Sequence, residues 1–222
     1  MIEGQGARGK GQGFDLVDLG LVPYREAWEL QKKIREERIN KKIPDRILLL
    51  EHPPVFTTGR RECGGDFCST AEAIANDGIE IVKTNRGGRV TYHGPGQLVC
   101  YFIFDLDELG IGVKDFVRTL EEISINLLSG FDIKAHRDVD HPGIWIGRKK
   151  IVAIGLNVSH GVTMHGIAIN VDCDLSPYRH IIACGIKDRS VTTMAIETSP
   201  PPAMENVKLS LKSQISSLNL LR

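Results

Sequence analysis

Apolar residues recur at helical spacing in three stretches of the chain. Over residues 24–40, aromatic and aliphatic residues stand three or four positions apart with charged residues between them, directly after Pro23. Proline is favoured at the start of a helix, and this spacing places the apolar side chains on one face, so the pattern predicts a helix. The same reasoning predicts helices over residues 115–128 and, after Pro200, Pro201 and Pro202, over residues 203–221.

Short runs rich in branched and aromatic residues separate these stretches and predict strands. We expect strands at residues 47–50, 79–83, 98–106, 133–136, 143–146, 151–158 and 162–171. The later runs are only a few residues apart, which favours antiparallel hairpins because parallel neighbours need long crossovers. The predicted fold class is therefore α+β, with a mixed, largely antiparallel sheet and flanking helices.

The beginning of the chain differs in composition from the rest. Residues 1–13 carry five glycines and almost no apolar side chains, a composition typical of a segment without fixed structure. The remainder shows no internal repeat or linker, and a chain of 222 residues is long enough for one domain with a substantial core. We expect a flexible glycine-rich segment at 1–13 and a single domain at 14–222.

Composition and charge exclude several classes of protein. Lys plus Arg and Asp plus Glu both number 28, so the overall charge gives no indication of nucleic-acid binding. No stretch approaches the roughly 18 apolar residues of a membrane span. The five cysteines are scattered and odd in number, which favours a reduced, cytoplasmic setting over a disulfide framework. Cys63 and Cys68 lack a second pair at zinc-ligand spacing, so we expect no metal site.

The segment 86–97 has the most unusual composition, R-G-G-R-V-T-Y-H-G-P-G-Q. Its glycines permit a ligand to approach the backbone closely, while Arg86 and Arg89 are suited to hold an anion. A glycine-rich turn is the structural alternative. The concentration of polar side chains at Thr91, Tyr92 and His93 favours a ligand site, because turns seldom gather so many.

Two further positions carry reactive groups, and each has a structural explanation as well. Lys150 begins an apolar run, where its amine could simply turn to solvent, and His165 could be a satisfied interior histidine. Cys184, in I-I-A-C-G-I, is by itself more consistent with an apolar filler than with a nucleophile. The nearby cations Arg179, His180 and Lys187 make an activated thiolate chemically feasible.

Five ordered motifs together resemble the octanoyltransferases of lipoate biosynthesis, a family related in fold to the biotin and lipoate protein ligases. They are H-P-P-V-F-T-T-G-R at 52–60, R-G-G-R-V-T-Y-H-G-P-G-Q-L-V at 86–99, K-I-V-A-I-G at 150–155, H-G-I-A-I-N-V at 165–171 and A-C-G-I at 183–186. The resemblance covers residues 24–197. The sequence departs from the familiar pattern at Cys100 and Phe102, in place of glycine and proline, and at Ala183, in place of proline.

The resemblance implies a catalytic domain of the biotin/lipoate ligase type that acts as an acyltransferase. The implied catalytic residues are Cys184, the acyl-accepting nucleophile, and its partner Lys150. The implied acyl-binding positions are Arg86, Gly87, Gly88, Arg89, Val90, Thr91, Tyr92, His93, Ala153, Ile154, Gly155, His165, Gly166, Ile167 and Ala168.

The resemblance also implies the reaction and its partners. An octanoyl group would pass from octanoyl-acyl-carrier protein to Cys184, and then to a specific lysine of the lipoyl domains of 2-oxoacid dehydrogenases or of the glycine cleavage H protein. Lys150 is expected to raise the thiolate fraction of Cys184, and Lys150, His93 or His165 would accept the proton of the attacking amine. The scheme needs no cofactor. We expect a cytoplasmic monomer that binds neither nucleic acid nor membrane.

Three alternatives stay open at the level of sequence. An ATP-dependent lipoate or biotin protein ligase would use the arginines of segment 86–97 to hold an adenylate phosphate. A binding module for lipoyl domains or carrier proteins would form no acyl-enzyme. An amidotransferase that moves octanoyl between two lipoyl-bearing proteins would differ only in its donor.

Overall fold

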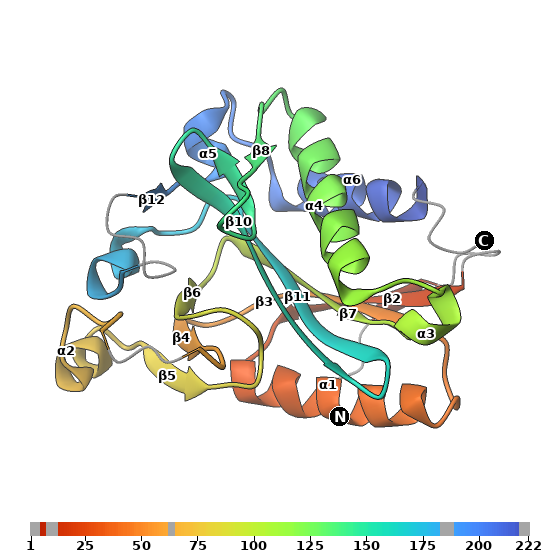
Figure 1. Cartoon of the computed structure of the whole chain (residues 1–222). Coiled ribbons are helices and arrows are strands. Elements are labelled where there is room, and N and C mark those ends of the chain that lie inside the picture. The colour runs from red at the N-terminus through yellow and green to blue at the C-terminus, as the bar shows by residue number, and fades with distance from the viewer. Residues whose placement is uncertain (1–4, 8–12, 62–64, 183–188, 218–222) are drawn as a thin grey trace.

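A long mixed sheet forms the centre of the protein (Figure 1). The computed structural model describes residues 5–7, 13–61, 65–182 and 189–217. The strand order is β1 (Gln5–Ala7), β2 (Phe14–Leu21), β3 (Asp45–Glu51), β7 (Gln97–Ile103), β11 (Val162–Asn170), β10 (Lys149–Ser159), β9 (Ile144–Ile146) and β8 (His136–Arg137), with β12 (Ser190–Val191) paired to β10. Strand pairs β2–β3 and β10–β12 are parallel and the other pairs of this sheet are antiparallel, which confirms the predicted class.

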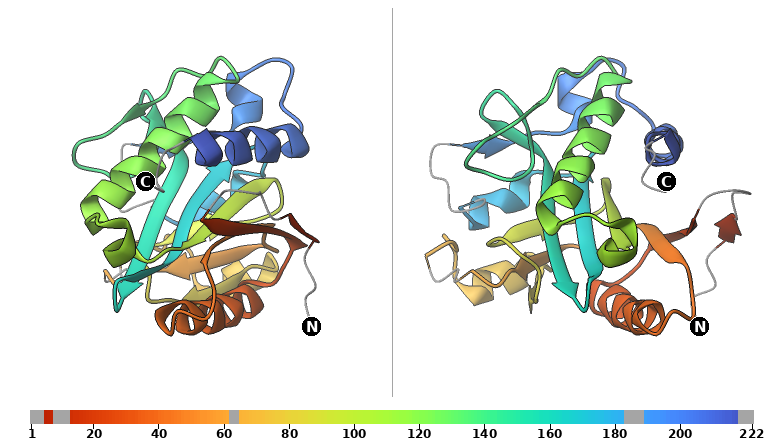
Figure 2. Two further views of the ribbon diagram at one scale, coloured as in Figure 1. Left: turned by 90° about the vertical axis from the view of Figure 1, so that its right-hand side faces the viewer. Right: turned by 45° about the vertical axis from the view of Figure 1, so that its right-hand side comes forward.

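Helices cover both faces of this sheet (Figure 2). On one face lie α4 (Val113–Ser129) and α6 (Met204–Ser217), and on the other lies α1 (Tyr24–Ile39). Alternation along β3 explains this arrangement, because successive side chains of a strand point to opposite faces. Ile47 and Leu49 pack in the core under α4 and α6, whereas Leu48 and Leu50 pack against α1.

A smaller sheet lies beside the main one and carries the glycine-rich segment. Its order is β5 (Glu80–Lys83), β4 (Val55–Thr58) and β6 (Thr91–His93), with α2 (Ala71–Asn76) packed on it. The remaining short elements are α3 (Leu106–Leu109), a 3₁₀ turn at Ser176–His180 and α5 (Met194–Glu197). No helix in the described parts of the chain is long and apolar enough to span a membrane.

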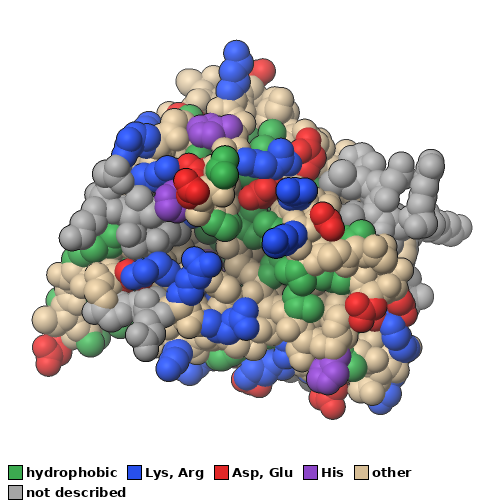
Figure 3. All heavy atoms as spheres, in the orientation of Figure 1, with side chains coloured by type: hydrophobic (Ala, Val, Ile, Leu, Met, Phe, Trp, Pro, Cys, Tyr) green, Lys and Arg blue, Asp and Glu red, His purple; other side chains and the backbone are tan. Residues whose placement is uncertain are grey.

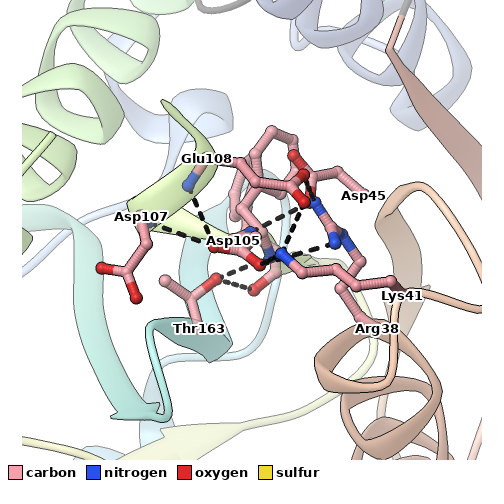
Figure 4. Close-up of polar contacts among 9 residues, drawn as sticks. Arg38, Lys41, Asp45, Asp105, Asp107, Glu108 and Thr163 are labelled. Carbon is pink, nitrogen blue, oxygen red and sulfur yellow. Dashed lines mark hydrogen bonds and ion pairs between the residues drawn. The ribbon is translucent and has the colours of Figure 1, made fainter. Parts of the chain in front are cut away.

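A group of charged side chains, of which Arg38, Asp45 and Asp105 are buried, joins the end of α1 to the starts of β3 and α3 (Figure 4). Arg38 Nε donates to Asp45 Oδ1 at 2.7 Å and also pairs with Glu108, while Lys41 Nζ donates to Asp105. Asp105 in turn accepts the backbone N–H groups of residues 107 and 108 at the start of α3. Arg38, Asp45 and Asp105 are each about 5% exposed, so loss of one would leave a buried charge without its partner, and these three residues fix how α1 and α3 meet the sheet.

Most predicted elements are confirmed within a few residues, and one is wrong. The strand predicted at 133–136 is wrong for residues 133–135, because β8 begins only at His136. The apolar Ile133 has a role at the end of a helix instead. Ile133 packs in the core and its N–H donates to Leu128 O, which closes the end of α4 after the left-handed Asp132. The predictions missed β1, β2, β4, β6 and β12, and the helices α2, α3 and α5.

The two departures from the family pattern in β7 leave the strand regular. Cys100 and Phe102 are buried, and β7 pairs continuously with β3 and with β11 around them. The third departure, Ala183, lies outside the described residues. Of the segment predicted to be flexible at 1–13, Gln5–Ala7 pairs with β2, and its description as flexible stays a prediction.

Candidate active site

A pocket of about 300 Å³ opens between the β10–β11 hairpin, β7, the segment before β6 and the first turns of α4. It is lined by these predicted site residues: Arg86, Gly87, Gly88, Arg89, Val90, Thr91, His93, Lys150, Ala153, Ile154, Gly155, His165, Gly166, Ile167 and Ala168. Tyr92 is absent from the lining. Its side chain packs against Phe56 and Tyr178, on the other side of β6 from its neighbours in sequence.

Arg86 is a structural centre of the glycine-rich segment. Its guanidinium group donates to Thr57 Oγ1 and O and to Gly87 O, at 2.9 Å for the last of these. The N–H of Gly87 donates to Leu156 O at 2.8 Å, which holds the segment against β10. A Cβ on Gly59 would lie 2.2 Å from Gly88 O, so this close approach requires glycine.

Arg89 pairs with a buried carboxylate. Its Nε donates to Asp66 Oδ2 at 2.7 Å, and its Nη2 donates to the other oxygen of the same group. Asp66 is 1% exposed, and its backbone oxygen accepts the N–H of Ile182 at 2.7 Å. Asp66 thus connects Arg89 in the pocket lining to Ile182, two residues before Cys184 in the sequence.

The hydrogen bonds around His93 fix its tautomer. Asn170 Nδ2 donates to Thr192 O, so Asn170 Oδ1 must accept from Gln97 Nε2 at 2.8 Å. Gln97 Oε1 therefore faces His93 and accepts from Nδ1 at 2.7 Å. His93 carries its hydrogen on Nδ1, and its Nε2 is an acceptor.

That acceptor is occupied by the hydroxyl group of Thr57. Thr57 Oγ1 lies 3.2 Å from His93 Nε2, and the same oxygen accepts from Arg86 Nε at 3.1 Å. Burial is the main reason that the pKa of His93 lies well below its ordinary value, and the nearby His52 and Arg86 lower it further. His93 is therefore a neutral part of a hydrogen-bonded chain that runs from Arg86 to Thr192.

Beside His93, the pocket is supported by His52, Tyr24 and Tyr101. His52 Nδ1 lies 2.6 Å from Val22 O and must donate to it, so Nε2 accepts from the Tyr101 hydroxyl at 2.7 Å. Burial lowers the pKa of His52 to about 4. The rings of Tyr24 and His93 are stacked, with centroids 5.9 Å apart.

His165 occupies a strained position in the wall formed by β11. It has φ of 65°, a left-handed conformation that is costly for a residue with a Cβ, and its backbone N–H donates to Gln31 Oε1 at 2.8 Å. Its Nε2 lies 2.8 Å from Asn85 Oδ1. Burial, with the charges of Arg86 and Arg35, lowers the pKa of His165 to about 3, so its imidazole is neutral.

Gly166 lets β7 and β11 approach each other next to the pocket. A Cβ on Gly166 would lie 2.1 Å from Cys100 O and 2.9 Å from a ring carbon of Phe102. Gly155 lies opposite Gly166 in the hairpin, where a Cβ would lie 3.2 Å from Gly87 O. Small residues here leave the pocket wall as bare backbone, with room for a slender ligand.

Lys150 stands at the start of β10 and is only 7% exposed. Its Nζ donates to Pro142 O at 3.0 Å and lies 4.6 Å from the ring centroid of Trp145. Gly143, with φ of 121°, brings the backbone close enough that a Cβ there would lie 3.4 Å from this amine. The solvent-facing orientation considered from the sequence is therefore wrong, and the amine is held inside the pocket.

Cys184 lies outside the described residues, so its predicted role stays a prediction. The described chain on both sides of it contacts residues that are bonded to the pocket lining or belong to it. Before it, Ile182 is bonded to Asp66, and after it, Val191 of β12 pairs with Lys150 of β10. Between them, Arg189 lies over the ring of Trp145, 4.6 Å from its centroid.

The matching family model describes a lipoyl protein ligase A/B catalytic domain and covers residues 23–216 of the chain. The chain belongs to this family. It is 43% identical over 187 residues to an octanoyltransferase of Dictyoglomus thermophilum, which covers 84% of this chain and 79% of the relative. It is 42% identical over 207 residues to an octanoyltransferase of Chloroflexus aggregans, covering 92% and 94%. These matches confirm the resemblance indicated by the five motifs and identify the protein as an acyltransferase.

Solved structures of the ligases show the same fold. A bipartite lipoate protein ligase of Thermoplasma acidophilum superposes with a TM-score of 0.72 at 18% identity, over 90% of this chain and 81% of that one. A biotin protein ligase of Aquifex aeolicus superposes with a TM-score of 0.55 at 17% identity, over 90% and 68%. The predicted relationship in fold to both groups of ligases is therefore confirmed.

Several residues of this family member's pocket were not predicted from the sequence. Tyr24 and Tyr101 line it, as do Val113 and Val117 from the first turns of α4. Periodicity gives these residues no role in a site, and only the packing of distant elements brings them to the pocket. Among the described residues, no three His, Cys, Asp or Glu side chains are grouped so that they could hold a metal ion.

Proposed function

We propose that this protein transfers an octanoyl group from octanoyl-acyl-carrier protein to a specific lysine of lipoyl domains, in the biosynthesis of lipoate. The acceptors would be the lipoyl domains of 2-oxoacid dehydrogenases and the glycine cleavage H protein. The observation that carries the proposal is a buried amine, Lys150, in the lining of a pocket of a chain whose relatives are octanoyltransferases.

Cys184 would be the nucleophile, and the described residues on either side of it in the chain support a position near this amine. Residues two apart in a chain are separated by roughly 7 Å at most, and Ile182 is bonded to Asp66, the partner of Arg89 in the pocket lining. On the other side of the pocket, Val191 pairs with Lys150. A nearby ammonium group stabilises a thiolate, which is the reactive form of cysteine.

The reaction would have two steps. The Cys184 thiolate attacks the thioester carbonyl of the donor, the pantetheine thiol leaves, and the acyl group is held as a thioester on Sγ. The substrate lysine amine then attacks that thioester, an amide bond forms, and the thiolate of Cys184 is released. Energy for the amide bond comes from the thioester, so the scheme needs no ATP.

The amine that attacks must also lose a proton. His93 and His165 are poor acceptors because the pKa of the first is well below its ordinary value and that of the second is about 3. We therefore assign this role to Lys150: its ammonium group gives a proton to the departing pantetheine thiolate in the first step, and the neutral amine that remains accepts the proton of the attacking lysine in the second.

An ATP-dependent ligase is the alternative, because its solved structures share this fold. The arginines favour the transferase. Arg86 donates to Thr57 and Gly87, and Arg89 forms a bidentate pair with Asp66, so both guanidinium groups already bond to protein oxygens. In a ligase we would expect them to point toward an adenylate phosphate.

The surface around the pocket suits a donor whose prosthetic group is attached through a phosphodiester. Several Lys and Arg side chains lie near the centre of the face seen in Figure 3, with hydrophobic side chains between them and Asp and Glu side chains above and to the right. Arg61 and Arg89 belong to the pocket lining itself. Clustered cations attract an anionic partner and raise its rate of association. We place the reaction in the cytoplasm, where a nucleophilic cysteine stays reduced.

The decisive experiment supplies a purified lipoyl domain with one of two donors. Octanoyl-acyl-carrier protein without ATP should give an octanoylated lysine, measured by mass spectrometry of the domain. Octanoate with ATP and Mg²⁺ should give none. Modification only in the second mixture would identify a ligase, and modification in neither would point to a binding module. An octanoylated H protein as donor tests the amidotransferase in the same assay.

A further inference from the structure

Trp145 is a buried aromatic residue next to the pocket, and its ring contacts two cations. It is 1% exposed and does not belong to the pocket lining. Lys150 Nζ and Arg189 Cζ each lie 4.6 Å from the centroid of its ring. The face of an indole attracts a cation, and the attraction is strongest where water is excluded. The ring therefore stabilises the charged form of the Lys150 amine over its neutral form.

The register of one hairpin places Trp145 beside Lys150. A turn at Gly147 and Arg148 joins β9 to β10, and Trp145 is the antiparallel partner of Lys150. Gly147 has φ of 56°, and the favoured two-residue hairpin turns have a positive φ at their first position. Directly opposed side chains of an antiparallel pair lie on one face, roughly 5 Å apart at Cβ. The contact between amine and ring therefore follows from the turn and the pairing.

Two consecutive carbonyl groups of the segment before β9 hold the amine and the ring in place. Lys150 Nζ donates to Pro142 O at 3.0 Å, and Trp145 Nε1 donates to His141 O at 3.1 Å. The cation and the edge of the ring are thus bonded to adjacent residues. This arrangement fixes the position of the amine relative to the indole.

A carboxylate balances the charge of Arg189 and organises the same segment. Arg189 Nη1 donates to Asp138 Oδ2 at 2.5 Å, and this hydrogen bond is the main reason that the pKa of Asp138 is lowered. Asp138 Oδ1 accepts the backbone N–H groups of Asp140 and His141, each at 3.0 Å. Asp138 therefore keeps Arg189 against the ring of Trp145 and shapes the segment that carries the two carbonyl groups.

We propose that Trp145 is a positioning residue of the active site, whose ring holds the Lys150 amine in place and in its charged form, while Arg189 and Asp138 fix the ring. Because Trp145 lies outside the pocket lining, it acts through Lys150. Its part in the reaction rests on the proposed function, in which the Lys150 ammonium group gives a proton to the departing thiolate. An amine that had already lost its proton could not take that step.

Core packing is the other role that a buried tryptophan can have. Packing alone does not distinguish an ammonium group from a neutral amine, so its loss would affect activity equally at every pH. A cation–π contact sheltered from water should move the ionisation of the amine by roughly 0.5–1.5 pH units. The pH at which the Lys150 amine loses its proton therefore separates the two roles.

The other ionisable groups near the amine are the same in every variant of the ring. His93 and His165 have lowered pKa values, and burial raises the pKa of Tyr24 to about 12 and that of Tyr101 well above its ordinary value, so all four are neutral at mildly alkaline pH. The remaining charged or titratable side chains in the described part of the pocket and its wall are Asp138, Asp140, His141, Arg61, Arg86, Arg89 and Arg189.

The first test measures the ionisation of the Lys150 amine directly, by competitive labelling with acetic anhydride across pH and peptide mass spectrometry. Trp145→Leu removes the ring, and Trp145→Phe keeps a smaller one. The pH of half-maximal labelling should fall by about 1 unit in Trp145→Leu and by about half as much in Trp145→Phe. Lys149, which pairs with Glu197 on the other side of the strand, is the internal control and should keep its labelling profile.

Trp28→Phe is the matched control for the ring itself. Lys32 Nζ lies 4.2 Å from the centroid of the Trp28 ring, on α1 and outside the pocket lining. This change alters a second indole that carries a lysine. It should leave the pH of half-maximal labelling at Lys150 unchanged.

The second test follows the pH dependence of kcat for octanoyl transfer to a lipoyl domain. In Trp145→Leu the decline at alkaline pH should begin about 1 unit lower, so transfer at a fixed pH on that limb should be about tenfold slower. KM for the donor should stay within about twofold, because the ring lies outside the pocket lining. Trp145→Phe should recover part of the loss.

An unchanged pH of half-maximal labelling in both Trp145 variants would overturn the inference. A uniform loss of transfer with an unchanged pH profile would overturn it as well, because packing alone predicts that result. Should Trp145→Leu fail to fold, as judged by urea denaturation, Trp145→Phe decides the question by the same two criteria. Absence of octanoyl transfer in the unmodified protein would refute the proposed function instead, and the labelling result would still stand, so the two failures are distinguishable.

Discussion

Replacing Lys150 with methionine removes the ammonium group and keeps most of the apolar stem. Lys150 is 7% exposed, so the stem should stay packed. The loss removes one hydrogen bond to Pro142 O and the contact with the face of Trp145. The variant therefore tests the charge of Lys150 with little disturbance of the wall around it.

The expected size of the effect follows from the acid strength of a thiol. An ordinary cysteine has a pKa of about 8.5, so roughly 3% is thiolate at neutral pH. A cation within about 4–6 Å lowers such a pKa by roughly 1–3 units. A decrease of about 1.5 units makes roughly half of the thiol reactive at neutral pH, so Lys150→Met should slow alkylation roughly tenfold. The difference should nearly vanish at alkaline pH, where both forms are ionised.

The assay is the rate of iodoacetamide alkylation at Cys184 across pH, followed by peptide mass spectrometry. Burial raises the pKa of Cys100 well above its ordinary value and that of Cys173 to about 12, so neither should compete. Cys68 is exposed and is best replaced by serine. Cys63, outside the described residues, is replaced in the same background.

Lys149→Met is the matched control for this prediction. The Lys149 amine is half exposed and pairs with Glu197, on the other side of the strand from the pocket. Its loss should leave the pH profile of Cys184 unchanged. An identical profile in Lys150→Met and the unmodified protein would refute the priming role of Lys150.

Two further predictions concern stability. His52, His93 and His165 have lowered pKa values in the folded protein, so below about pH 6.5 the unfolded chain binds more protons than the folded one. The free energy of unfolding should therefore decrease as the pH falls toward about 4, by about 1 kcal/mol per pH unit for each histidine. Urea denaturation at several pH values measures this, and a midpoint that does not fall between neutral pH and pH ~5 would contradict it. Gly166→Ala places a Cβ 2.1 Å from Cys100 O and should lower the free energy of unfolding by roughly 1–3 kcal/mol. A urea midpoint equal to that of the unmodified protein would contradict this, because it would show that β7 and β11 can move apart without cost.

Elements with strong periodicity could be predicted from the sequence. The apolar spacing of α1 and α4 identifies both helices, because each buries one continuous face along its whole length. The strand β2 has weaker alternation, since its side chains are only partly buried, and it was missed. Ile133 was assigned to a strand because apolar character alone does not distinguish strand pairing from the closing contact at a helix end.

The pocket could be predicted in part. Glycine content and family motifs predict segment 86–93 and the positions in the β10–β11 hairpin, and the structure brings these residues together around the pocket. Tyr92 is the exception, because alternation along β6 turns its side chain to the other face. Tyr24 and Tyr101 could not be found, because their place in the pocket comes from the packing of α1 and β7 against distant parts of the chain. Long-range packing of this kind leaves no local signal in the sequence.

The central claim is that Cys184 carries the acyl group. Its most direct test is the intact mass of the protein after brief incubation with octanoyl-acyl-carrier protein and no acceptor, followed by peptide mapping. We predict an increase of one octanoyl group, located on Cys184, sensitive to hydroxylamine, absent in Cys184→Ala and retained in Cys68→Ala. An enzyme that octanoylates lipoyl domains while Cys184 stays unmodified, or a Cys184→Ala variant of undiminished activity, would contradict the account.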